Sequence, residues 1–256
     1  MIDGAGKTLL PGLIDAHTHV WPGTLESALS FGVTTELAMF SDPAAAKVLR
    51  DQQAAGTATA RADMLSAGTL VTAPGGHGTQ FGMPIPTITM PAEAQAFIDA
   101  RLAEGSDYIK IVYDNGHTYG MTLSTNSRET LRALISATHA RQKLAVVHIG
   151  DLASARDAID AGADGLVHLY VDQAPDAEFA AFVARHRAFV VPTMTGLKSI
   201  AYSSLTAIPP PTSPPRARLS ASGSRAYGLT APRLPQRSHP RATMLPARHA
   251  GLSQAS

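Results

Sequence analysis

Several residue types and patterns are missing from this chain of 256 residues, and each absence narrows its chemistry. There is no cysteine, which excludes disulfides and thiolate metal sites and leaves His, Asp, Glu or a modified side chain as metal ligands. No apolar run reaches the length of a membrane span, and no basic-then-apolar start suggests a signal peptide. We therefore expect no membrane partner and a cytoplasmic location.

Acidic residues and lysine are missing from the last part of the chain. Residues 201–256 contain seven Arg, ten Ala, nine Pro and nine Ser, but no Asp, Glu or Lys. The stretch "IPPPTSPPRAR" excludes helix and strand, so we expect residues 201–256 to form a disordered, irregular tail. An arm that binds nucleic acid usually adds lysines and aromatic residues, so we expect no nucleic-acid partner. The composition instead suggests a changed reading frame after about residue 200.

Short apolar runs alternate with helical patterns in residues 1–200, which we expect to form one domain. The helical pattern at 126–142 has Asn126 and Glu129 as a capped start, and the pattern at 151–162 runs from Asp151 to Gly162. Repeated strand–helix units predict a parallel α/β sheet, and a TIM-type (β/α) barrel with about seven strands is favoured. An open doubly wound sheet is the alternative, but no G-x-G-x-x-G motif supports it. The expected strands lie at 9–20, 34–40, 64–73, 108–114, 144–150, 165–170 and 189–194.

Polar side chains occur at the ends of several of these apolar runs. His17 and His19 lie two residues apart, so on a strand they face the same side. Lys110 lies inside "YIKIVYD", while His148 and His168 lie near the ends of "LAVVHIG" and "GLVHLY". Each residue alone is more often a satisfied core or loop residue. Together, at the carboxyl ends of parallel strands, they predict a site for a divalent metal, with one or two ions.

The motifs "LLPGLIDAHTHV", "GSDYIKIV", "LAVVHI" and "AGADGLVHL" resemble the amidohydrolase superfamily, in particular its imidazolonepropionase-related and Xaa-Pro dipeptidase subgroup. The resemblance covers roughly residues 2–200. It implies a barrel of eight strands and a metal-activated water that cleaves a C–N bond in a small-molecule amide or dipeptide. It also implies that His17 and His19 bind the more buried metal, that Lys110 is carboxylated and bridges two metals, and that His148 and His168 bind the second. Zinc suits such ligands, as do cobalt, manganese and iron.

Two departures from the family pattern weaken the expected activity. The chain starts directly before its first strand, so we expect it to be truncated at the N-terminus. The aspartate that normally ends the eighth strand is missing, because the last acidic residue is Glu178. The catalytic acid–base residue is therefore unknown, and we expect weak or no turnover. With seven strands, the first and the last keep open edges, at which a second copy could form a homo-oligomer.

Three residues in loops after strands are candidates for binding substrate. His77 follows the third expected strand, and Tyr113 and His117 belong to "YDNGHTYG", which begins at the end of the fourth. Two alternatives to the dinuclear hydrolase stay open. One is a mononuclear deaminase or cyclic-amide hydrolase, and the other is a non-catalytic remnant that binds metal or nothing.

Overall fold

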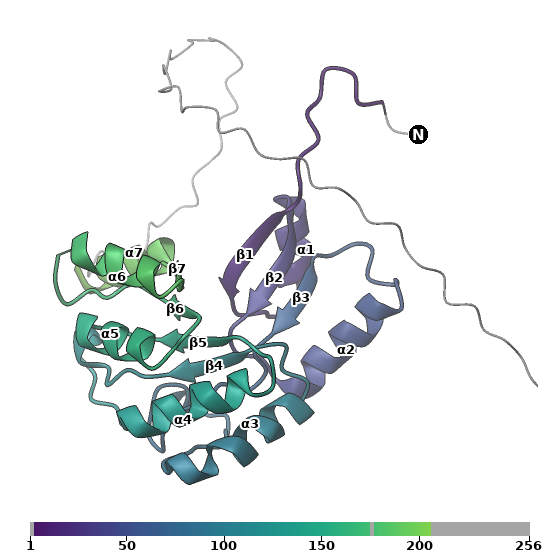
Figure 1. Cartoon of the computed structure of the whole chain (residues 1–256). Helices are drawn as coiled ribbons and strands as arrows, with labels where there is room; N and C mark the ends of the chain where they lie inside the picture. Colours follow the sequence, from purple (N-terminus) through teal and green to yellow (C-terminus); the bar gives the residue numbers. More distant parts are fainter. Residues whose placement is uncertain (1–2, 175–176, 206–256) are drawn as a thin grey trace, which may run out of the picture. The chain divides into compact units, whose positions relative to one another are not determined.

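The computed structural model describes residues 3–174 and 177–205 (Figure 1). All of these residues belong to the first of two units, Met1–Ala207, whereas the second unit, Ile208–Ser256, lies outside the described residues. Strands and helices alternate along the chain, as the apolar runs predicted. All seven expected strands are present. They are β1 (Leu13–Thr18), β2 (Val33–Ala38), β3 (Asp63–Ser66), β4 (Ile109–Val112), β5 (Ala145–His148), β6 (Gly165–Val167) and β7 (Phe189–Val191).

Helices follow most of the strands and cover them. In the described part of the chain, α4 packs against β4 and β5, α2 against β3 and α5 against β6. The helices are α1 (Thr24–Ser30), α2 (Pro43–Ala54), α3 (Ala94–Ala103), α4 (Arg128–His139), α5 (Leu152–Asp160), α6 (Ala177–Arg185) and α7 (Met194–Leu205), with short 3₁₀ turns η1 (Thr79–Phe81), η2 (Pro91–Glu93) and η3 (His117–Tyr119).

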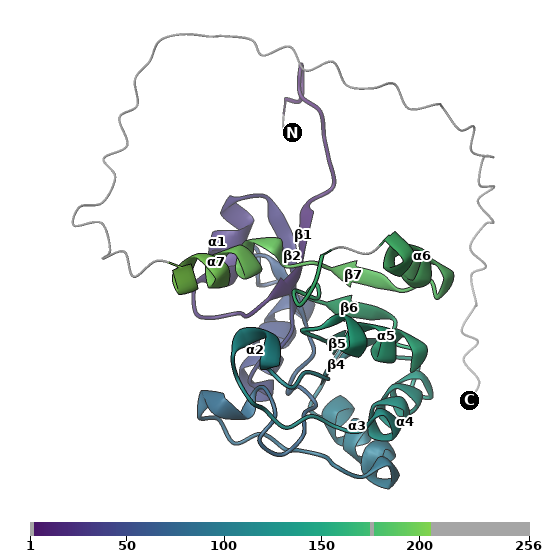
Figure 2. The same ribbon diagram turned by 90° about the vertical axis from the view of Figure 1, so that its left-hand side faces the viewer.

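The strands form two parallel sheets instead of one continuous sheet. One sheet has the order β1-β2-β3 and the other the order β4-β5-β6-β7, which Figure 2 shows as four successive strands. The expected strand 64–73 is interrupted, because the chain turns at Gly68 in the left-handed region (φ 61°). Val71 then makes an isolated bridge to Ile111 of β4. In the described part of the chain, the strand ladder is therefore discontinuous between β3 and β4, where only this bridge pairs the two sheets, and β1 and β7 do not pair with each other.

Hydrogen bonds around the start of β4 link the two sheets. Asp107 donates its backbone N–H to the Ser66 carbonyl and accepts the Ser66 N–H, both at 2.8 Å. The Tyr108 hydroxyl donates to the Ala38 carbonyl, also at 2.8 Å. These contacts place the end of β3 beside the start of β4 although few ladder bonds join the strands.

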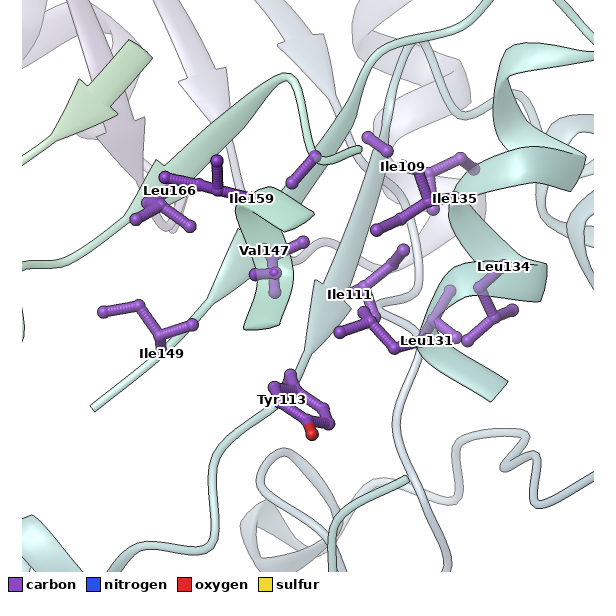
Figure 3. Close-up of a cluster of buried hydrophobic side chains, with 14 of the residues drawn as sticks. Ile109, Ile111, Tyr113, Leu131, Leu134, Ile135, Val147, Ile149, Ile159 and Leu166 are labelled. Atoms are coloured by element: carbon purple, nitrogen blue, oxygen red, sulfur yellow. The ribbon is translucent and has the colours of Figure 1, made fainter. Parts of the chain in front are cut away.

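Side chains of β4 and β5 alternate between two apolar layers. Ile109, Ile111 and Tyr113 pack with Val147 and Ile149 in the larger core, which lies against α4 and α5 (Figure 3). Val146 of β5 instead joins a smaller cluster with Met39, Ala67, Tyr108 and Val167. The alternation leaves Lys110 and His148 on the opposite face of the sheet from the larger core.

The N-terminal cap of α5 is the residue predicted from the sequence, whereas that of α4 is a different residue. Asp151 caps α5 as predicted, with its carboxylate accepting from the Ser154 N–H at 2.7 Å. The cap of α4 is Ser127 and not Asn126, because the Ser127 hydroxyl accepts from the Thr130 N–H at 3.1 Å. Glu129 lies in the first turn of α4.

The end of the described chain differs from the expected boundary. Helix α7 continues to Leu205, so its last turn enters the segment 201–256 that was expected to be irregular. No proline lies at residues 193–208, which permits this extension. The remainder of the expected tail, residues 206–256, lies outside the described residues. Among the described helices, none is long and apolar enough to cross a membrane.

Candidate functional site

Four imidazoles from three separate segments meet in one cavity of about 1470 Å³. The ring of His168 lies 4.7 Å from that of His17 and 4.5 Å from that of His148, measured between centroids. The His19 ring lies 5.6 Å from the His17 ring. The structure therefore brings together the histidines that the sequence placed at the ends of three strands.

Lys110 reaches the same cavity from β4. Its side chain is almost fully buried (3% exposed), and among the described residues its amine has no hydrogen bond or ion pair. Burial lowers the pKa of Lys110 from 10.5 to about 7, because the uncompensated ammonium is poorly solvated. A large fraction of this amine is therefore neutral near physiological pH.

The imidazoles are held in their neutral form. Burial, followed by the positive charge of Lys110, lowers the pKa of His17 to about 2. Burial also lowers the pKa of His168 to about 2, and that of His148 falls well below its ordinary value for the same reason. A neutral imidazole keeps one nitrogen lone pair, which is the form that binds metal ions.

The backbone at His168 directs its ring into the cavity. Leu166 packs in the larger core and Val167 in the smaller cluster, so simple alternation would turn residue 168 toward the larger core. His168 instead has φ 80°, and Thr193, which follows β7, has φ 45°. The His168 Nδ1 and the Thr193 hydroxyl are 2.7 Å apart. This hydrogen bond joins two strained residues and leaves the Nε2 of His168 available.

The imidazole nitrogens are of a type that binds divalent cations, although their present positions do not surround a single point. The Nδ1 of His17 is buried without a hydrogen-bond partner, so this nitrogen is available to bind a metal ion among the other imidazoles. Among the described residues, no three His, Asp or Glu side chains already have the geometry of metal ligands. Binding a cation at the roughly 2 Å ligand distances of zinc therefore requires side-chain rotations.

Asp114 is a site residue that the sequence analysis missed. It is 2% exposed, lines the cavity and has its Oδ2 3.2 Å from the Nε2 of His148. Its Oδ1 accepts from the Gly116 N–H at 2.9 Å. A Cβ on Gly150 would lie 2.6 Å from Thr118 Oγ1, 2.9 Å from Asp114 Oδ1 and 3.0 Å from Asp114 Oδ2, so a side chain there would displace these groups. The sequence could have indicated Asp114, because it lies an even number of residues after Lys110, and such residues on a strand face the same side.

Of the three candidates for substrate binding, only His77 lines the cavity. Its ring stacks on that of His148 with centroids 4.7 Å apart, and its Nδ1 lies 2.9 Å from the Gln80 amide nitrogen. Burial lowers the pKa of His77, and Lys110 adds to this effect.

The structure does not bring Tyr113 or His117 to the cavity. Tyr113 lies an odd number of residues from Lys110, so it points into the larger core in line with Ile109 and Ile111 (Figure 3). Its hydroxyl donates to the Asp157 carboxylate at 3.2 Å, and burial raises its pKa to about 12. His117 is exposed in η3 and is not among the lining residues, whereas Tyr119 of the same turn is.

Comparisons with known proteins identify the fold. The sequence matches no family model and no curated protein. A solved Xaa-Pro dipeptidase with bound methionine in its active site is 23% identical with a TM-score of 0.64, covering 77% of this chain and 56% of that chain. An amidohydrolase is 22% identical with a TM-score of 0.64, covering 82% and 59%. The ochratoxinase of A. niger is 18% identical with a TM-score of 0.63, covering 77% and 55%. The chain has the fold of the amidohydrolases.

The amidohydrolase fold confirms the fold class and the resemblance inferred from the four motifs. The chain spans between 55% and 59% of the length of these three structures. In a TIM-type barrel the carboxyl ends of the strands carry the chemistry. His148 is the last residue of β5, and His168 directly follows β6. The cavity thus lies at the end of the strands where a TIM-type barrel places its site.

Proposed function

We propose that this chain is a metal-dependent hydrolase that cleaves the C–N bond of a small-molecule amide or dipeptide, with weak turnover because no acidic residue follows Glu178 to serve as the acid–base group. One observation supports this most strongly. Imidazoles from three strand ends and a buried amine without a partner face one cavity in a chain with the amidohydrolase fold. Unpaired buried polar groups are costly unless they serve a purpose, and a bound cation would supply one.

The proposed ligands follow the family resemblance residue by residue. His17 and His19 would hold the first cation, while His148 and His168 would hold the second. Lys110, after carboxylation, would lie between them. We propose zinc, because it prefers imidazole and carboxylate ligands. A divalent cation in this place supplies Lewis acidity, which acidifies water and polarises a carbonyl group.

The chemistry of Lys110 supports this role. Only a neutral amine reacts with carbon dioxide, and the lowered pKa of Lys110 supplies that form near pH 7. A bond forms between Nζ and the carbon of carbon dioxide, and the amine releases one proton. The product is a carboxylate, whose negative charge suits a position beside cations.

The remaining side chains position the ligands and enclose the substrate. Asp114 holds His148 through its Nε2, and Thr193 holds His168 through its Nδ1. In the overall reaction, water adds a hydroxyl group to the acyl carbon and a proton to the leaving nitrogen. The C–N bond breaks and gives an acid and an amine.

Zinc binding and amine release test this proposal. Equilibrium dialysis with elemental analysis should find at least one zinc ion per chain, and the double variant His17→Asn/His19→Asn should bind zinc at least about tenfold more weakly. The matched control His139→Asn/His186→Asn changes two histidines outside the cavity and should bind zinc as the unchanged chain does. Release of amine from a panel of amides and dipeptides should stop when zinc is chelated.

Two results would contradict the proposal. A chain that binds no zinc would rule out the metal site. Zinc binding without release of amine from any substrate would favour the non-catalytic alternative.

A further inference from the structure

The wall of the cavity outside the imidazole cluster is strongly apolar. Five of the eight methionines of the chain line it, namely Met39, Met64, Met83, Met121 and Met194. Leu70 and Phe81 extend the same wall. Methionine side chains are flexible and polarisable, so such a wall adapts to apolar groups of different shapes. The wall therefore favours a ligand with a sizeable apolar substituent.

The charges around the cavity are mostly negative. Lys110 is the only lysine or arginine among the described lining residues, whereas Asp15, Asp42 and Asp114 contribute three carboxylates. The sequence resemblance assigns Lys110 to the metal centre. No other described cationic side chain in the lining could pair with a carboxylate on a ligand.

The three aspartates are already used by the fold. Asp15 accepts from the His17 N–H at 3.0 Å, and Asp42 caps α2 by accepting from the Ala45 N–H at 2.8 Å. Asp114 accepts from the Gly116 N–H beside His148. Their positions are therefore fixed, and a ligand carboxylate held at the apolar wall, outside the proposed metal sites, would lie close to like charges with little to compensate its lost hydration.

From this lining we infer that the cavity selects uncharged amides with an apolar substituent and discriminates against substrates with a free carboxylate, including dipeptides. The inference rests on the proposed function, because it narrows the substrate class of the same site. The apolar wall would hold the substituent, while the imidazole cluster faces the amide group. Selection would come as much from the lack of a lysine or arginine for a ligand carboxylate, among the described lining residues, as from the apolar contacts.

The chain carries its own probe of cavity occupancy. Trp21 is the only tryptophan, it lines the cavity and it is 72% exposed, so a bound ligand should change its fluorescence. N-acetyl-phenylalanine methylamide and N-acetyl-phenylalanine form a matched pair of similar size, one uncharged and the other anionic above pH 6. We expect the methylamide to bind at least about tenfold more tightly to the protein as purified, with its metal content measured in the same sample. Equal or tighter binding of the acid would overturn the inference.

An added cation in the wall tests the cause of the selection. Met121 and Met83 are 38% and 43% exposed, so either position should accept arginine. Met121→Arg should lower the preference for the methylamide at least about threefold, and Met83→Arg serves if the first variant does not fold. Met90→Arg is the matched control, because Met90 is exposed outside the cavity and its substitution should leave the preference unchanged. An unchanged preference in the two wall variants would overturn the inference.

Binding and hydrolysis separate this inference from the proposed function. A preference for the uncharged ligand without release of amine would uphold the inference while the proposed function fails. Faster hydrolysis of a dipeptide than of its uncharged amide would overturn the inference while the proposed function stands.

Discussion

Lys110 should make the metal-free protein less stable, and its replacement by methionine should reverse this effect. Its amine is buried without a partner among the described residues, and its pKa falls from 10.5 to about 7 on folding. Between these values the unfolded chain binds more protons than the folded chain, so stability should rise as the pH increases from 7 to 10.5. At about 1.4 kcal/mol per pKa unit, Lys110 lowers the free energy of unfolding at pH 7 by an amount on the order of 4 kcal/mol.

The variant Lys110→Met keeps a similar length and removes the charge. In degassed buffer with EDTA, we expect its free energy of unfolding at pH 7 to exceed that of the unchanged chain by up to about 4 kcal/mol. At pH 10 the difference should be much smaller. Urea unfolding followed by circular dichroism measures both values, and a parallel titration should show that the same variant binds zinc more weakly.

Lys47→Met provides the control for this comparison. Lys47 is exposed and pairs with Asp51 on α2 at 2.6 Å, so its loss should change stability by less than about 0.5 kcal/mol at either pH. If Lys110→Met were no more stable than the unchanged chain at pH 7, the amine would have a compensating partner. The reasoning from burial would then be refuted.

Three further predictions concern the site and the core. Asp114→Asn should weaken zinc binding by about 10- to 100-fold, because His148 loses its carboxylate partner. Gly150→Ala should also weaken zinc binding, because its Cβ would displace Asp114. A zinc titration that shows unchanged affinity for both variants would contradict this. Acid should destabilise the metal-free protein, because His17 and His168 have folded pKa values of about 2 and bind protons near pH 6.5 only when unfolded. Below that pH the free energy of unfolding should fall by up to about 1.4 kcal/mol per pH unit for each residue. The variant His17→Gln/His168→Gln should therefore flatten the pH profile of urea unfolding. Leu134→Ala should cost about 2 to 5 kcal/mol in the same unfolding assay, since this residue of α4 is fully buried in the larger core. A loss below about 1 kcal/mol would show that the core adapts.

The alternation of side chains made much of the site predictable from sequence. A strand repeats every two residues, so the assignment of His17 and His19 to one side depended only on the presence of a strand. The same rule, counted from Lys110, places Asp114 in the cavity and Tyr113 in the core. The error over Tyr113 came from treating the end of β4 as a loop, where the rule was not applied.

Other features depend on contacts that a single sequence does not reveal. The interruption after β3 depends on the left-handed turn at Gly68, yet glycine is also tolerated within strands. Ser127 and Asn126 are both good cap residues, and the choice between them follows from which side chain reaches the Thr130 N–H. In the loop after β4, the 3₁₀ turn η3 brings Tyr119 and not His117 to the cavity. Each choice is decided by tertiary packing.

His168 shows why the exceptions to local rules point to the site. Simple alternation after Leu166 and Val167 would turn its ring toward the larger core, and only the left-handed backbone at φ 80° brings it to His17 and His148. A non-glycine residue in that region costs about 1 to 3 kcal/mol, and Thr193, its hydrogen-bond partner, bears a similar cost. Lys110 adds a buried amine without a partner in the same cavity. Of the four described non-glycine residues with positive φ, His168 and Thr193 line this cavity whereas Gln142 and Arg187 do not, and the pair in the cavity supports the site independently of the resemblance to known motifs.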